Sequence, residues 1–437
     1  MIALLMLLAC DGYGLLVLGS SGVSTVGNAT WNAAPGSRTR LVAEEAGAVR
    51  VRSDWAAAEV GVVSMPVLGL LADTEYDLFV EAEDGTAGQP VAFTTGPLPV
   101  TLPRWSTTGS PGWEGFSVTS LMGDSQWAVV LDEAGNPVWF VEIPTEDRLV
   151  RVRARRDGLG VWGVPATRAD KSDPSELIGL DWNGAEIERH ELTDFSHDFL
   201  ELSDGTIATL NYDPREIDGI EVIGNTITEV DLETGDSIDV FSTFDLWQPD
   251  LDTLPGDGEW TGGNALDFDE GQGTYMAGFR QLGALVEVDR ATGEVGRQLG
   301  GPSSDYAFPK LEDALRLQHQ FQWSGDSALV FDNRESTEDS RVIDYALAEG
   351  LATPKWTYVS DPPLWVFALG DVDRAEDGAT LIDWAAAGVL EEVSPEGESR
   401  WKLEAELGTA FGFLDRGPRI GAFTRPSAAA VGGEPEG

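Results

Sequence analysis

Positive charge is scarce in this chain of 437 residues. Its 28 Lys and Arg stand against 75 Asp and Glu, which gives a formal net charge of −47. A surface of this kind repels the phosphates of nucleic acids and of anionic membranes. The acidic residues are spread through the turns instead of forming one tail, as on a solvated surface. We therefore expect no nucleic-acid partner and interpret the charge as a source of solubility.

Cysteine and long apolar runs are also nearly absent. Cys10 is the only cysteine, so the chain can form no internal disulfide. The apolar run in "MIALLMLLACDGYG" is too short to span a bilayer as a stable helix. Residues 1–10 resemble a bacterial lipoprotein signal, with "LLAC" as the lipobox and Cys10 as the lipidated residue. An ordinary secretory signal with an incidental cysteine is the alternative, and both predict export, with membrane attachment only through a lipid on Cys10.

Several catalytic and metal-binding patterns are missing as well. There is no Walker loop, no Ser-centred nucleophile elbow and no Cys/His set for zinc. Acidic stretches such as "LDFDEGQG" do not have the spacing of an EF-hand. We therefore expect neither a metal nor a cofactor. The hydrophobic fraction of 42% and the 15 Trp are enough for sizeable packed cores.

Residues 28–99 are predicted to form a small β-sandwich. Stretches such as "VRVRSDW" and "VAFTTG" alternate apolar and polar residues and are separated by Gly, Asp and Pro. "LADTEYDLFVEAEDG…VAFTTG" resembles a fibronectin type III domain, in which Tyr76 would lock one end of the sandwich. "PLPVTLP" follows as a stiff proline-rich linker.

From residue 105 the chain repeats a strand, a Gly-containing turn and a second strand. The repeat recurs every 49 to 58 residues, at Asp132, Asp181, Asp231, Asp289, Asp344 and Ser394. A second hairpin type lies between these, so each period holds four strands and six periods can close a ring. The sequence thus predicts an all-β chain, a six-bladed β-propeller over residues 105–425 preceded by a small β-sandwich. Residues 426–437 are predicted to be a disordered tail.

Three stretches carry the candidate functional residues. They are "DFSHDFLELSDGTIATL" with His197, "EWTGGNALDF…GFRQ" with Asn264 and Arg280, and "LQHQF…LVFDN" with His319 and Asn333. Two of them follow the longest loops, where sites on rigid scaffolds are usually built. Each belongs to a hairpin of its own blade, so ring closure can bring them together at one end of the axis.

These motifs, in this order, resemble the bacterial arylsulfotransferase family. The resemblance implies an exported propeller that moves a sulfuryl group from an aryl sulfate donor to a phenolic acceptor through a sulfohistidine, without a nucleotide sulfate donor. By motif, His319 is the nucleophile, Arg280 holds the sulfate oxygens and His197 assists binding or protonates the leaving group. Asn264 and Asn333 are expected to line the substrate site.

The chain departs from the family pattern at Gly262, where a histidine is expected two residues before Asn264. Losing one donor to the sulfuryl oxygens commonly costs ~10² to 10³ in rate, so we expect Gly262→His to raise the rate if this donor is limiting. The alternative function is a non-catalytic surface propeller that binds a ligand or a protein. In that case His319 is a structural histidine and Arg280 pairs with a carboxylate. His190 matches no motif and is expected to be exposed on a hairpin.

Overall fold

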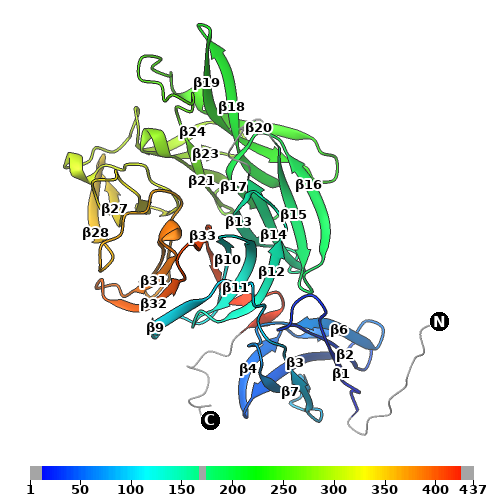
Figure 1. Cartoon of the computed structure of the whole chain (residues 1–437). Coiled ribbons are helices and arrows are strands. Elements are labelled where there is room, and N and C mark those ends of the chain that lie inside the picture. The colour runs from blue at the N-terminus through cyan, green and yellow to red at the C-terminus, as the bar shows by residue number, and fades with distance from the viewer. Residues whose placement is uncertain (1–11, 167–173, 425–437) are drawn as a thin grey trace.

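The structure is a computed structural model that describes residues 12–166 and 174–424. It contains a small N-terminal β-sandwich and a ring of six sheets, seen in Figure 1. The predicted fold class, a six-bladed β-propeller preceded by a β-sandwich, is confirmed. Cys10 and the tail 426–437 lie outside the described residues. Within the described ranges, no helix is long and apolar enough to cross a membrane.

The N-terminal domain has two facing sheets. One contains, in spatial order, β1 (Leu16–Gly19), β2 (Gly27–Asn32) and β6 (Val62–Val67). The other contains β4 (Ala48–Ser53), β3 (Arg38–Glu45), β7 (Glu75–Ala82) and β8 (Val91–Thr94), with β5 (Ala56–Ala57) beside β3. The buried Tyr76 accepts a hydrogen bond of 2.8 Å from the Leu71 amide and so fixes the turn before β7. The fibronectin type III resemblance itself stays a prediction.

Each blade is an antiparallel sheet, and in blades 2 to 6 the first strand is innermost in the ring. Blade 1 contains β10 (Phe116–Met122), β11 (Gln126–Asp132) and β12 (Pro137–Ile143). Blade 2 contains β13 (Arg148–Ala154), β14 (Gly160–Ala166), β15 (Ser175–Asp181) and β16 (Glu186–Leu192). Blade 3 contains β17 (Phe195–Glu201), β18 (Ile207–Ile217), β19 (Ile220–Val230) and β20 (Ser237–Ser242).

The remaining blades follow the same order. Blade 4 contains β21 (Gly263–Asp269), β22 (Thr274–Phe279), β23 (Ala284–Asp289) and β24 (Val295–Gly300). Blade 5 contains β25 (Phe321–Ser324), β26 (Ser327–Asp332), β27 (Arg341–Ala348) and β28 (Leu351–Tyr358). Blade 6 contains β29 (Asp371–Arg374), β30 (Thr380–Asp383), β31 (Val389–Val393) and β32 (Ser399–Ala405). Short helices lie in the connections: α1 (Thr243–Leu246), η1 (Arg280–Leu282), η2 (Leu311–Asp313) and η3 (Ala385–Ala387).

The repeated acidic residue closes the turn between the third and fourth strands of a blade. Asp181, for example, accepts hydrogen bonds from the amides two and four residues later, at 2.9 and 2.8 Å. This is the local chemistry that makes Asp favourable in tight turns. Asp344 is the exception, because it lies inside β27 and its carboxylate pairs with Arg374 and Lys355. The alignment at that position was therefore wrong, and the turn of blade 5 follows at residues 349–350.

Both ends of the propeller segment close the ring. The innermost strand of blade 1 comes from the C-terminal part of the chain, as β33 (Ala410–Phe411) and β34 (Asp415–Gly417) beside β10. On blade 6, β9 (Trp105–Gly109) adds a fifth strand outside β32. The hairpin of β35 (Arg419–Ile420) and β36 (Phe423–Thr424) then pairs with β4. Residues 419–424, which the sequence assigned to the propeller, thus extend a sheet of the N-terminal domain.

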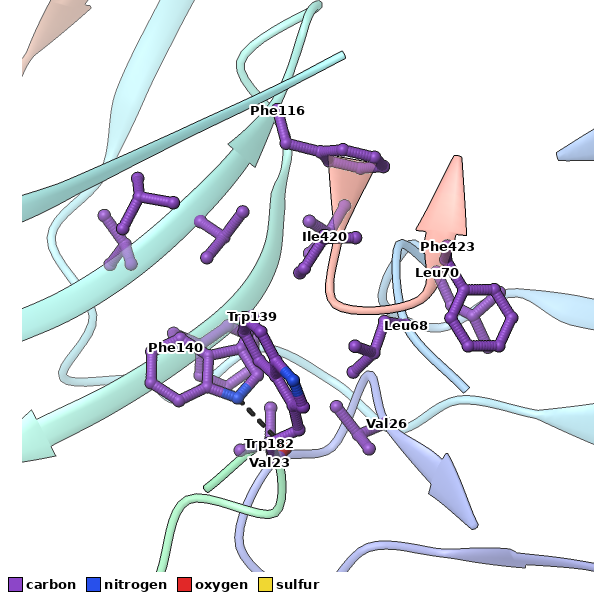
Figure 2. Packing of buried hydrophobic residues seen from close by; sticks show 14 of the residues in the cluster. Val23, Val26, Leu68, Leu70, Phe116, Trp139, Phe140, Trp182, Ile420 and Phe423 are labelled. Atoms are coloured by element: carbon purple, nitrogen blue, oxygen red, sulfur yellow. Dashed lines mark hydrogen bonds between the residues drawn. The ribbon is translucent and has the colours of Figure 1, made fainter. Parts of the chain in front are cut away.

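One hydrophobic core joins the N-terminal domain to the first two blades. Figure 2 shows its members from the sandwich, the blades and the hairpin: Val23, Val26, Leu68, Leu70, Phe116, Trp139, Phe140, Trp182, Ile420 and Phe423. Trp139 Nε1 donates to the Trp182 carbonyl at 3.0 Å. Arg50 Nη2 also lies 2.7 Å from Asp132 Oδ2 in a buried ion pair. The two domains therefore pack as continuous protein interior.

Candidate functional site

The candidate residues gather at the end of the ring where the innermost strands begin, which we call the channel mouth. His197 and Asn264 lie near the starts of β17 and β21, and His319 lies two residues before β25. Long connections lead into two of these strands, residues 243–262 and 301–320. The link predicted between long loops and candidate residues is therefore present in the fold.

Hydrogen bonds of Asn333 fix the His319 ring. The Asn333 amide nitrogen donates to the carbonyls of Val366 and Leu369, at 2.9 and 2.8 Å. Its Oδ1 therefore faces His319 Nδ1, 2.6 Å away. Because an amide oxygen can only accept, Nδ1 carries the proton of the neutral imidazole. Nε2 then holds the lone pair, which is the form that a nucleophile or a base needs.

His197 is oriented in a similar way through Ser196. The Ser196 hydroxyl donates to the Gly263 carbonyl at 2.8 Å and lies 2.7 Å from His197 Nδ1. Since its one proton is committed to Gly263, the hydroxyl accepts from Nδ1. The lone pair of neutral His197 therefore also belongs to Nε2. Two histidines from different blades thus share one tautomer, each set by a neutral hydrogen bond.

Further hydrogen bonds join these positions into one group. Asn264 Nδ2 donates to the Gln318 carbonyl at 2.7 Å, next to His319. The Arg280 amide donates to the Gly262 carbonyl at 2.8 Å, next to Gly263. The structure therefore links the His197, Asn264, Arg280 and His319 segments through blades 3, 4 and 5. We call His197, Ser196, Asn264, His319 and Asn333 the histidine layer; His197 is 8% exposed and His319 is 2% exposed.

Arg280 makes no ion pair with any described residue. Burial lowers the pKa of its guanidinium, and the carboxylates of Glu259 and Glu335 raise it in part. The buried Nε of Arg280 and the buried side-chain oxygens of Asn264 and Gln318 have no hydrogen-bond partner in the described part of the chain. Buried polar atoms rarely remain unpaired, because each costs roughly 1–3 kcal/mol. The group therefore suits a polar ligand that both accepts and donates hydrogen bonds.

Gly262 is held in a conformation that favours glycine. Its φ is +64°, and an added Cβ would lie 2.9 Å from Gln281 Cγ and 3.6 Å from Arg280 Cβ. A histidine there would be strained and would push against Gln281. A gain in rate from Gly262→His stays a prediction, and the strain at this position opposes that gain.

A second layer follows one residue further along the same strands. Arg151 on β13 forms ion pairs with Asp198 on β17, Asp371 on β29 and Asp415 on β34, with N–O distances of 3.2, 3.4 and 3.0 Å. Gln320 Nε2 and the Leu266 amide also donate to Asp198, at 2.6 and 3.1 Å. We call Arg151, Arg153, Asp198, Gln320, Asp371 and Asp415 the charge layer. Five blades thus contribute side chains to it, and blade 4 contributes the Leu266 amide.

Arg151, Asp198, Gln320 and Asp371 of the charge layer are buried, and the pKa values of Arg151 and Asp371 are shifted. Burial lowers the pKa of Arg151, but the three carboxylates together raise it above the ordinary value. Burial raises the pKa of Asp371 to about 7, with Arg151 opposing the shift. Phe413 connects the two layers, since its ring lies 5.3 Å from the Arg151 guanidinium and 6.4 Å from the His319 ring.

The sequence analysis missed the charge layer and misplaced His190. Arginines alternate at 151, 153 and 155 in a chain with few cations, which is the signal that could have found one half of the layer. His190 is half-buried on β16, with Nε2 3.0 Å from Glu188 and its ring against Trp162, so its predicted exposure was wrong. Within the described ranges, no cluster of three His, Cys, Asp or Glu side chains is arranged to hold a metal ion.

The fold and these residues define a six-bladed propeller with a histidine layer at one channel mouth. The chain belongs to the arylsulfotransferase family: residues 115–391 match the family described as arylsulfotransferase (ASST). No curated relative matches the chain.

Several solved structures resemble the chain at low identity. A protein of unknown function from Bacteroides caccae is 11% identical, with a TM-score of 0.45 over 70% of this chain and 99% of that one. A periplasmic gluconolactonase from Pseudomonas aeruginosa is 12% identical, with a TM-score of 0.42 over 87% of this chain and 99% of that one. A virginiamycin B lyase from Staphylococcus aureus is 10% identical, with a TM-score of 0.38 over 69% of this chain and 88% of that one.

Proposed function

We propose that this protein is an aryl-sulfate sulfotransferase in which His319 carries the sulfuryl group. The observation that carries the proposal is the 2.6 Å contact between Asn333 Oδ1 and His319 Nδ1, which leaves the lone pair on Nε2. Membership of the arylsulfotransferase family supports sulfotransferase activity in general. The aryl sulfate donor, the phenolic acceptor and the roles of individual residues are our inference.

In the first step Nε2 of His319 attacks sulfur, and the bond between sulfur and the aryl oxygen breaks. The phenolate leaves with the electron pair and takes a proton from Nε2 of His197, which enters this step as the imidazolium and leaves it in the neutral form described above. In the second step an acceptor phenol gives its proton to His197, its oxygen attacks sulfur, and the N–S bond breaks. A covalent intermediate divides one difficult transfer into two easier ones.

Arg280 would stabilise the sulfuryl oxygens through charge-assisted hydrogen bonds. Its buried Nε has no partner in the described part of the chain, so binding a sulfate oxygen would satisfy it. Burial of His319 also keeps bulk water away from the sulfohistidine, which favours transfer to a phenol over hydrolysis. Asn264 would place its unpaired Oδ1 toward the acceptor hydroxyl.

The test is release of nitrophenol from nitrophenyl sulfate with phenol as acceptor. We expect wild type to turn over and His319→Ala to lose at least about 10³-fold in rate. His190→Ala is the matched control, because it removes a histidine from outer strand β16 and should leave the rate unchanged. Mass spectrometry of quenched wild type should find the added sulfuryl group on the His319 peptide. Turnover that survives His319→Ala would contradict the mechanism.

The alternative is a non-catalytic propeller that keeps the scaffold for binding. Its support is the deep burial of His319, at 2% exposure, together with glycine at position 262. In that case wild type binds a ligand at the channel mouth and releases no nitrophenol. Export, and a lipid on Cys10 as the only membrane attachment, remain proposals that radiolabelled fatty acid incorporation into wild type and Cys10→Ser would test.

A further inference from the structure

Two aromatic side chains stand out on the loop between β28 and β29. Trp365 is 44% exposed and Phe367 is 61% exposed, and their ring centroids lie 6.3 Å apart. No other Trp, Phe or Tyr in the described part of the chain is exposed to this degree. Adjacent exposed aromatics on a soluble protein usually mark a recognition surface.

Hydrogen bonds connect the backbone of this loop to the histidine layer. Val366, which separates the two aromatic residues, is buried and its carbonyl accepts from Asn333 Nδ2 at 2.9 Å. Its amide donates to the Ser340 hydroxyl at 2.8 Å. The two rings are therefore held outward on a fixed backbone, and two hydrogen bonds connect that backbone to His319.

Two arginines lie near this loop. Trp365 Nε1 donates to the Arg334 carbonyl at 3.4 Å, and Arg334 directly follows Asn333. Arg334 and Arg316 share the carboxylate of Glu338, and the buried Nε atoms of both arginines have no hydrogen-bond partner among the described residues. These two unpaired N–H donors beside exposed aromatic rings favour a ligand that carries both an aromatic ring and an anionic acceptor group.

We propose that Trp365 and Phe367 form a platform on which the aryl ring of the sulfate ester rests at the channel mouth. This inference deepens the proposed function and rests on it for the identity of the ligand. Aromatic rings stack on one another with a preference for offset or edge contacts, so the platform selects aryl over alkyl sulfates. After the first transfer, the acceptor phenol occupies the same surface.

Kinetics with two donors test the platform. For nitrophenyl sulfate, Trp365→Ala and Phe367→Ala should each raise KM by about 3- to 10-fold and leave kcat within about 2-fold. A naphthyl sulfate should show the larger increase, because its ring covers more of the platform. Trp365→Phe should restore most of the affinity. Ile238→Ala is the control, since it removes an exposed apolar side chain from outer strand β20.

Binding of naphthyl sulfate, measured by calorimetry, separates this inference from the proposed function. If wild type binds the ester and Trp365→Ala weakens binding, the result supports the platform proposal, even when no nitrophenol is released. If nitrophenyl sulfate is turned over but neither substitution changes KM or calorimetric affinity, the platform is overturned and the sulfotransferase proposal stands. Wild type that binds no naphthyl sulfate also overturns the platform.

Discussion

The histidine layer and the charge layer meet at neighbouring residues of the chain, yet they are held in different ways. His197 and Asp198 are consecutive, as are His319 and Gln320. In the histidine layer, a single neutral hydrogen bond from each Nδ1, to Ser196 or to Asn333, sets the orientation of the ring. In the charge layer, one arginine is saturated by three carboxylates.

Neighbouring residues therefore differ in what they serve: the histidines serve reactivity and the ion-paired residues serve stability. Because Nδ1 of each histidine donates a hydrogen bond, its lone pair belongs to Nε2. In the charge layer, by contrast, the carboxylates neutralise the charge of Arg151. The charge layer therefore suits a structural role, closing the middle of the ring. The histidine layer suits chemistry. Four changes test this division.

Arg151→Met should give the largest effect on stability. It leaves Asp198, Asp371 and Asp415 without their shared buried cation, and breaking a buried ion pair typically costs about 3–5 kcal/mol. Urea unfolding measures the loss. Arg153→Met is the control, because its side chain is more exposed and bridges only two of the carboxylates. A loss below about 1 kcal/mol would contradict a structural role for the charge layer.

Asn333→Ala should act mainly on the reaction. Without the Oδ1 acceptor, His319 can adopt either tautomer, and losing such an orienting partner commonly lowers activity by about 10- to 100-fold. The rate of nitrophenol release measures this, with urea unfolding in parallel. Asn136→Ala, in a turn of blade 1, should leave the rate unchanged. If the Asn333 variant lost stability but kept its full rate, the division between the layers would fail.

Asp371→Asn should change the pH dependence of stability. Because the folded-state pKa of Asp371 is raised to about 7, the folded protein binds this proton more tightly than the unfolded chain does. Its contribution to the free energy of unfolding therefore falls from about pH 4 to about pH 7 and stays low above that. Tm measured across this range should fall less steeply for the variant than for wild type. Parallel curves would show that Asp371 titrates normally.

Gly262→Ala should give the smallest effect. A positive φ costs a non-glycine residue about 1–2 kcal/mol, and the added Cβ also meets Gln281. Gly219→Ala is the control for backbone strain alone, because its φ is +78° and nothing lies within 4 Å of an added Cβ. The difference between the two variants in urea unfolding measures the contact with Gln281. Equal losses would mean that the contact relaxes freely.

The sequence predicted the ring because its signals are local. Asp and Ser at the hairpin turns bond their own neighbouring amides, so their spacing reports the blade period directly. Asp344 misled the alignment because its carboxylate pairs with Lys355 on the adjacent β28 and Arg374 on β29, and not with the amides of its own turn. Strands of two residues, such as β36, carry no periodic pattern, so the pairing of the last hairpin with β4 could not be predicted.

For the site, the sequence identified histidines by motif but could not identify their partners. Val366 and Leu369 hold Asn333 through their backbone carbonyls. Because every residue has a backbone carbonyl, the residue types at these positions do not indicate the contact. The φ of Gly262 and the exposure of Trp365 likewise depend on neighbours far along the chain. The pattern around Arg151 is typical of a strand, but the three carboxylates that pair with Arg151 come from three other blades.

The pairing of residues 410–424 also constrains how the protein is made. The innermost strand of blade 1 and the hairpin beside β4 both come from this segment, whereas their partner strands are synthesised much earlier. A nascent chain therefore exposes one edge of β10 and one edge of β4 until residues 410–424, which follow blade 6, have been synthesised. A product that stops short leaves both domains incomplete at once, so the cell can distinguish full-length from truncated chains by their folding alone.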